Sequence, residues 1–298
     1  MNEIMNIVCP QFMRSDEHSY NFLIQQQGII DSSNIKSIKW DMTNTEIFET
    51  NLLAMLSYIF EKAYRRNKMI FVYLPSGYWF EYKMSVMGIF NYYSQDKKAF
   101  FKPRKVGYRN ARETEDVIIK YLKSLKLKEY AKIKILISEM IANIKMHTLY
   151  HEGVIASDYL AEFNQIVFSI ANYDYSIRNQ LLCRRKLEFS SDLEAIIWCL
   201  RKSNSSRNDE ESGGLGLYLL RKYISELSGK VSILSGSCYV EFDGSCYDKH
   251  DENRVDIQKS ETLKSDYQGT IITIYIPYDV DTDDKLDSGD IDTETIEL

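Results

Sequence analysis

The first third of the chain combines strand-like and helix-like patterns of apolar side chains. Apolar and polar residues alternate over 34–41, which is typical of a half-buried strand. Apolar residues recur at helical spacing over 47–66 and again over 82–89, and a β-rich run occupies 69–74 between them. The order strand, helix, strand, helix predicts a small α/β domain within residues 1–108.

The rest of the chain mixes the two patterns over longer segments. Helical spacing predicts helices at 115–125, 130–149, 191–201 and 217–224. Strand-like runs occupy 164–171, 230–235, 238–242 and 269–277. The second and third of these runs have the spacing of a hairpin, and a polar insertion at 243–267 separates them from the last run. Residues 109–278 are therefore expected to form a second, larger α+β domain.

Charge is distributed unevenly along the chain. The 298 residues carry a formal net charge of −6. Residues 279–298 hold nine acidic residues and one lysine, a net charge of −8, which leaves +2 on the rest of the chain. We expect this acidic segment to be a disordered tail. The nearly neutral body has no general nucleic-acid footprint, so nucleic acid is not an expected partner.

The lack of a targeting signal in the sequence, together with the cysteine usage, favours a cytoplasmic protein. No stretch has the ~20 consecutive apolar residues of a membrane-spanning helix, and the N-terminus lacks the basic and apolar regions of a signal peptide. None of the five cysteines forms a Cys-x-x-Cys pair, and the four histidines are scattered. We therefore expect free thiols in a reducing compartment. We expect neither membrane association nor a zinc site. The sequence does not decide whether the protein forms a homodimer.

A basic segment at 97–112 has interleaved aromatic residues. Basic and aromatic side chains together can bind single-stranded nucleic acid. A solvated linker with a few docked aromatics explains the same composition. We favour the linker, because Pro103 and Gly107 fit a boundary between the two predicted domains.

Three polar residues recur every four positions in the predicted helix 130–149. Glu139, Asn143 and His147 therefore share one helix face, beside an apolar stripe. A polar edge that simply faces solvent is the plain alternative. If a nucleotide lies here, a carboxylate can polarise the attacking water, and an amide oxygen can complete the oxygen shell of Mg²⁺.

A glycine cluster at 213–216 opens the predicted helix 217–224. Glycine lets the backbone approach a ligand closely, and a helix N-terminus offers free N–H groups to a phosphate. An ordinary helix-opening turn has the same appearance. Asn172 and Asp174 follow the buried strand 164–171, where their side chains could bind the polar edge of a small molecule.

The order of these features resembles the GHKL ATPase superfamily of gyrase, the ninety-kilodalton heat-shock chaperone, histidine kinases and MutL. Residues 138–147, Ser-Glu-Met-Ile-Ala-Asn-Ile-Lys-Met-His, are similar to the family's N-box in the form found in anti-sigma-factor kinases. Residues 172–177 stand where the family has its first glycine box, and Gly-Gly-Leu-Gly-Leu at 213–217 resembles the second. Gly269-Thr270, followed by a strand, resembles the last element.

The resemblance implies a Bergerat-type α/β sandwich, in which helices cover one face of a mixed sheet, with ATP and Mg²⁺ as cofactors. Glu139 would be the catalytic base, and Asn143 would hold the metal. Asn172 would bind the adenine amino group, and Thr270 would support adenine. The remaining residues implied to bind nucleotide are two lid residues and the second glycine box: Ser206, Arg207, Gly213, Gly214, Leu215, Gly216 and Leu217.

The first glycine box departs from the family pattern. Asn172 replaces the adenine-binding Asp, and Asp174 and Ser176 replace two glycines. The amide oxygen of Asn172 can still accept a hydrogen bond from an amino group. Asp174 is an alternative residue for contacting the base. A domain that keeps this fold but no longer binds a nucleotide is a further alternative.

Residues 1–108 resemble, in pattern only, the STAS fold of anti-sigma-factor antagonists. Those proteins carry a phosphorylatable Ser at a turn where, in this chain, Thr43 or Thr45 could take its place. An interaction or dimerisation module is the plainer interpretation. Together, the resemblances predict a slow ATPase that acts as a conformational switch for a protein partner. The alternatives are an anti-sigma-type Ser/Thr kinase and an interaction module without catalysis.

Overall fold

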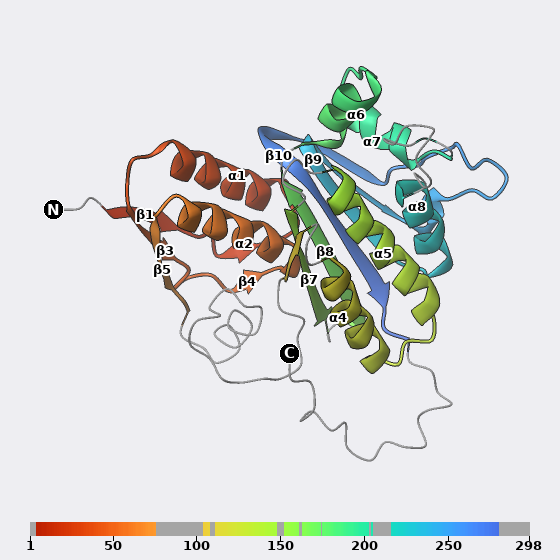
Figure 1. Ribbon diagram of the computed structural model, residues 1–298, viewed down its shortest axis with the longest axis horizontal. Helices are drawn as coiled ribbons and strands as arrows, with labels where there is room; N and C mark the ends of the chain where they lie inside the picture. The colour runs from red at the N-terminus through yellow and green to blue at the C-terminus, as the bar shows by residue number, and fades with distance from the viewer. Residues whose placement is uncertain are drawn as a thin grey trace, which may run out of the picture.

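Residues 4–75 form a three-stranded parallel sheet with two helices on one of its faces (Figure 1). The strands β1 (Ile4–Val8), β3 (Ser37–Asp41) and β5 (Met69–Tyr73) lie in the order β1-β3-β5. The connecting helices and the short parallel pair that precedes them are α1 (Glu17–Ser32), α2 (Thr50–Arg65), β2 (Phe12–Met13) and β4 (Ile47–Phe48). The predicted first strand, first helix and second strand are confirmed as β3, α2 and β5. Strand β1 and helix α1 have no counterpart among the predicted elements.

The computed structural model describes residues 4–75, 104–107, 111–147, 152–160, 163–173, 175–202, 204 and 216–279. The helix predicted at 82–89 lies outside these residues. So do most of the basic segment at 97–112 and nearly all of the acidic tail.

The second sheet has five strands in the order β6-β7-β8-β10-β9. They are β6 (Arg104–Gly107), β7 (Glu152–Leu160), β8 (Gln165–Tyr173), β9 (Lys230–Asp243) and β10 (Lys259–Pro277). All four pairings in this sheet are antiparallel. The α+β class is therefore confirmed, but the mixed pairing that we expected in this sheet is not found.

The predicted hairpin within 230–242 is wrong, because these residues form one strand, β9, that pairs with β10. Gly236 has a φ of +61° and lies where the register between β9 and β10 shifts. Gly236-Ser237 is thus a bulge that bends the strand rather than a turn that ends it. The predicted polar insertion is also shorter than expected, since β10 already begins at Lys259.

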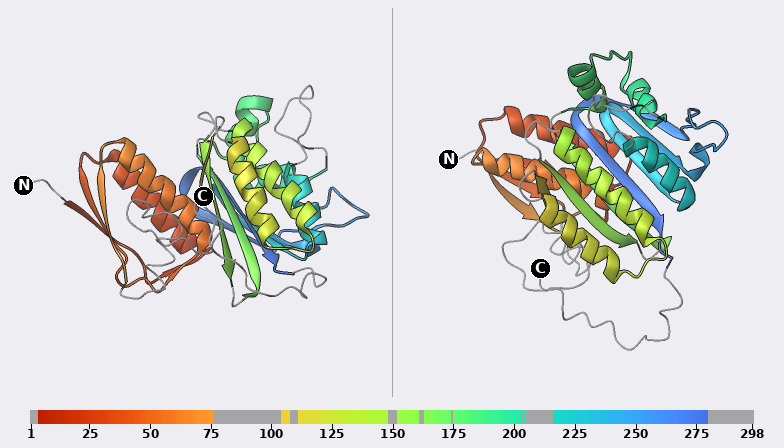
Figure 2. Two further views of the ribbon diagram at one scale, coloured as in Figure 1. Left: turned by 60° about the horizontal axis from the view of Figure 1, so that its bottom comes forward. Right: turned by 45° about the vertical axis from the view of Figure 1, so that its right-hand side comes forward.

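Helices cover both faces of the five-stranded sheet (Figure 2). On one face lie α4 (Ala111–Ser124), α5 (Tyr130–His147) and α8 (Gly216–Glu226), with α6 (Ile177–Arg185) and α7 (Asp192–Leu200) at its edge. On the other face lie α1 and α2, which the three-stranded sheet covers in turn. The molecule therefore has four layers, in the order helix, sheet, helix, sheet.

Strand β8 divides its side chains between two hydrophobic cores, because successive side chains in a strand point to opposite faces. Phe168 and Ile170 pack in the core below α5. Ala171 and Tyr173 pack in the core that contains α1 and α2. The Tyr173 ring stacks on Tyr58 of α2, with ring centroids 3.3 Å apart, and its hydroxyl donates to the Ala54 carbonyl at 2.8 Å.

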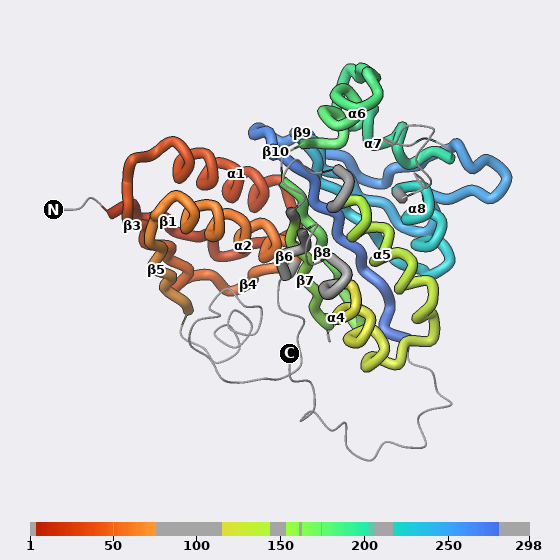
Figure 3. The backbone as a smooth tube through the Cα atoms, viewed as in Figure 1, coloured from red at the N-terminus to blue at the C-terminus, as the bar shows by residue number. Residues whose placement is uncertain are grey.

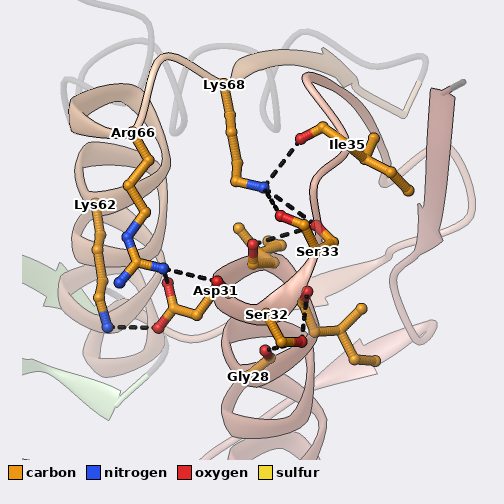
Figure 4. A network of polar contacts seen from close by, with 10 residues as sticks. Gly28, Asp31, Ser32, Ser33, Ile35, Lys62, Arg66 and Lys68 are labelled. Carbon is orange, nitrogen blue, oxygen red and sulfur yellow. Dashed lines mark hydrogen bonds and ion pairs between the residues drawn. The ribbon is translucent and has the colours of Figure 1, made fainter. Parts of the chain in front are cut away.

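Polar contacts fix the ends of α1 and α2 against each other (Figure 4). The buried Lys68 donates through Nζ to the carbonyl oxygens of Ser33 (2.7 Å) and Ile35 (2.9 Å) and to the Ser33 hydroxyl (3.1 Å). These bonds satisfy the three donors of the ammonium group and hold the C-cap of α1. Asp31, near the end of α1, pairs with Arg66 at the end of α2 at 3.0 Å. Burial lowers the pKa of Lys68.

Candidate functional site

Helices α5 and α8 run antiparallel beside each other over one face of the sheet (Figures 1 and 3). Lys132, in the first turn of α5, pairs at 3.2 Å with Glu226, the last residue of α8. From this pair, the distance along α5 to Asn143 is about 17 Å and the distance along α8 back to Gly216 is about 15 Å, at 1.5 Å per residue. The start of α8 and Asn143 therefore lie at the same end of the molecule.

The end of β8 lies toward the same end of the sheet. At the opposite end, the backbone N–H of Lys128 donates to the Asp279 carbonyl (3.0 Å), and that of Tyr278 donates to the Asn164 carbonyl (2.7 Å). From this junction β8 rises about 27 Å to Asn172, at ~3.4 Å per residue. Helix α5 runs the same way over the sheet (Figure 1).

The polar face of α5 lies at the border of the core. Glu139 and Asn143 are both half-buried and one helical turn apart, while neighbours such as Met140 and Ile141 belong to the core. Ser138 donates from its hydroxyl to Glu115 Oε1 on α4 at 2.7 Å, which fixes the rotation of α5. The predicted apolar stripe is confirmed for the described part of α5. A carboxylate and an amide, both within reach of solvent, flank this stripe.

Asn172, at the end of β8, is held by two hydrogen bonds from β10. The Thr270 backbone N–H donates to its side-chain Oδ1 at 2.8 Å, and the Tyr267 hydroxyl donates to its carbonyl at 3.3 Å. Gly269, which lies between these two residues, closely approaches the Asn172 carbonyl, and any Cβ at this position would overlap that oxygen. The glycine of the predicted Gly-Thr motif therefore lets β10 approach β8, which places the Asn172 amide.

A short chain of hydroxyl groups continues from Thr270. Its side chain is buried, and Oγ1 lies 3.0 Å from the Ser235 hydroxyl on β9. Ser235 Oγ also accepts from the backbone N–H of Ile177, the first residue of α6, at 2.7 Å. Thr270 thus connects β10 with the ends of β8, β9 and α6. Its hydroxyl is already hydrogen-bonded within the protein.

Helix α8 begins at Gly216, and the half-buried Leu217 follows in its first turn. His147, the third member of the predicted polar face, is the last residue of α5. Six of the predicted site residues lie outside the described residues: Asp174, Ser206, Arg207, Gly213, Gly214 and Leu215.

Of the two threonines considered as substitutes for a phosphorylatable Ser, Thr45 is buried and donates to the Pro10 carbonyl. Thr43 is exposed and bonded to Asp41.

A cluster around Glu252, beside the start of α8, has no counterpart in the sequence predictions. The Glu252 carboxylate accepts from the hydroxyls of Tyr218 (2.6 Å) and Tyr247 (2.9 Å) and pairs with Lys202. The bond from Lys202, followed by the two tyrosine bonds, lowers the pKa of Glu252 to about 2. Beneath it, the buried Arg221 donates to the Glu252 carbonyl. These members come from three separate segments, so no local spacing in the sequence indicates the cluster.

Neither the comparison with models of protein families nor the search of curated proteins finds a match for this chain. Within the described residues, no helix is both long and apolar enough to cross a membrane.

Proposed function

We propose that residues 104–279 form a Bergerat-type ATP-binding domain and that the chain is a Mg-ATP-dependent conformational switch. One observation carries the proposal: four segments far apart in sequence lie toward the same end of the sheet. They are the polar face of α5, the end of β8, the start of α8 and Gly269-Thr270 in β10. The three helices α4, α5 and α8 on one face of the sheet also support it.

The chemistry of these groups fits a nucleotide. Asn172 offers an amide at the point where the resemblance implies a base, and it is fixed by Thr270. A helix N-terminus such as that of α8 offers free N–H groups to phosphate oxygens. Glu139 and Asn143 offer one carboxylate and one amide, both only half-buried. Mg²⁺ prefers oxygen ligands and takes several of them from phosphate and water.

Each residue then has a defined role. The amide oxygen of Asn143 would hold Mg²⁺, and the N–H groups at the start of α8 would bind the phosphates. Glu139 would orient water and accept its proton. Bound ATP supplies the phosphoanhydride bond whose cleavage resets the switch. Slow turnover suits a switch, because the bound state must persist long enough to be sensed.

A protein partner in the cytoplasm is part of the proposal. The outward face of the three-stranded sheet supports it, since apolar side chains from both edge strands are exposed there. Ile4 is 61% exposed and Met69 57%, and the pairing of both residues with Ser37 places them on one face. Exposed apolar groups that share a face are typical of interaction surfaces.

The first prediction separates nucleotide binding from turnover. Glu139→Ala should leave ATP affinity within about threefold of the wild type but reduce turnover ~100-fold or more, the contribution typical of a general base. Asn143→Ala should abolish the Mg²⁺ dependence of binding. Calorimetry with a non-hydrolysable ATP analogue, with and without Mg²⁺, measures binding, and phosphate release measures turnover.

Two exposed residues serve as matched controls, Glu188→Ala and Asn34→Ala. Both should behave as the wild type in binding and in turnover. Turnover that survives Glu139→Ala unchanged would show that another group is the base. Equal Mg²⁺-dependent binding by wild type and Asn143→Ala would remove Asn143 from the metal site.

A further inference from the structure

The Asn172 amide has a fixed orientation at the end of β8. Its Oδ1 accepts from the backbone N–H of Thr270 at 2.8 Å. A backbone N–H is only a donor, so the atom facing it must be the oxygen, and the Nδ2 group must point away from β10. Among the described residues, none accepts a hydrogen bond from this Nδ2. The free part of the side chain therefore includes a pair of N–H donors.

The surroundings of Asn172 oppose a flip of this amide. A flip would place Nδ2 against the Thr270 N–H and leave two donors facing each other. The backbone on both sides is fixed as well, because Tyr267 donates to the Asn172 carbonyl and the Thr270 hydroxyl is bonded to Ser235. Gly269 packs so closely against the Asn172 carbonyl that an added Cβ would overlap its oxygen.

An amide and a carboxylate select different purines. A carboxylate only accepts hydrogen bonds, so it matches the 6-amino group of adenine and opposes the 6-oxo group of guanine or hypoxanthine. The outward N–H groups of Asn172 can donate to a 6-oxo group, or to N1 of adenine. The second lone pair of Oδ1 remains available to an amino group or to an N1–H.

We infer that Asn172 makes this a purine site that accepts 6-oxopurine nucleoside triphosphates as well as ATP. The inference rests on the proposed function, which places the base at Asn172. Asn172 is then a specificity-determining residue, and its replacement by Asp should restore exclusion of the 6-oxo group.

The test compares ATP with inosine triphosphate, which differs from ATP only in the 6-oxo group and the N1 proton. The Kd ratio of inosine triphosphate to ATP is measured by calorimetry with Mg²⁺ for the wild type and for Asn172→Asp. The wild-type ratio should lie within about threefold of one, because either base can pair with the amide. Asn172→Asp should raise the ratio about tenfold or more, the scale of discrimination that one well-placed polar group gives.

Asn172→Asp keeps an oxygen for the Thr270 N–H, so it should fold. Asn34→Asp, at an exposed position between α1 and β3, makes the same change of charge away from the site and should leave the ratio unchanged. A wild-type ratio above ten would overturn the inference while leaving ATP binding intact. A ratio that Asn172→Asp does not change would overturn it too. If ATP, inosine triphosphate and inorganic tripolyphosphate all fail to bind, the proposed function itself is wrong.

Discussion

At the scale of single residues, Glu252 shows how one carboxylate can join separate segments. It bonds Lys202 after α7, Tyr218 in the first turn of α8, and Tyr247 in the loop before β10. Arg221 lies below, with its guanidinium 5.4 Å from the centre of the Tyr247 ring. The start of α8 therefore depends on a charge that belongs to a loop thirty-four residues away.

This dependence predicts a pH effect on stability. The pKa of the folded Glu252 carboxyl, about 2, lies below its ordinary value of 4.5. A depressed pKa stabilises the folded state at pH values above 4.5, and the contribution is lost as the pH falls from there toward 2. Glu252→Gln should therefore lower the urea midpoint at pH 7, and the difference from wild type should shrink below pH 4.5. The exposed Glu188→Gln is the control, and a difference that does not change with pH would contradict the assignment.

At the scale of elements, the sequence pattern predicted α5 well and β9 poorly. Helix α5 has apolar residues at regular spacing, and one-sided burial on a sheet requires that spacing. In β9, Gly236-Ser237 has the composition of a turn, and only the pairing with β10 makes it a bulge. Helix α1 escaped prediction because three glutamines and Gly28 interrupt the run of apolar residues in its sequence. A cap at Asp16, which accepts from the Ser19 N–H, was the available signal.

The same contrast between local pattern and tertiary context predicts that Gly→Ala has opposite effects on stability at two positions. Gly236 has a left-handed φ, and an added Cβ would overlap the Asp192 carboxylate that binds Ser237. Gly236→Ala should therefore lower the free energy of unfolding by about 1–3 kcal/mol. Gly28, in mid-helix, has open space around it, so Gly28→Ala should raise that free energy by about 0.5–1 kcal/mol. Urea denaturation measures both, and a stabilised Gly236→Ala would show that the bulge is not required.

At the scale of the whole molecule, the candidate site is one strand away from the N-terminal helices. Neighbouring residues of β8 point to opposite faces of the sheet, so Asn172 lies on the α5 side and Tyr173 on the α2 side. The placement of Asn143 and Glu139 on one face of α5 followed from spacing in the sequence. The contact between Tyr173 and Tyr58 could not be predicted in this way, because no local pattern indicates which surface covers the second face of a sheet.

This arrangement predicts that removing a side chain from one face of β8 destabilises only the helices packed on that face. Tyr173→Ala removes the ring that stacks on Tyr58 and should lower the free energy of unfolding by about 3–5 kcal/mol. Hydrogen exchange should then rise in peptides from α2 as well as from β8, because local opening follows the loss of packed contacts. Ile170→Ala is the matched control, since it lies in the same strand but packs toward α5. It should raise exchange in α4 and α5 and leave α2 protected. If both variants expose the same helices, the two cores open as one unit, and α2 would respond to events on the α5 side without any specific role for Tyr173.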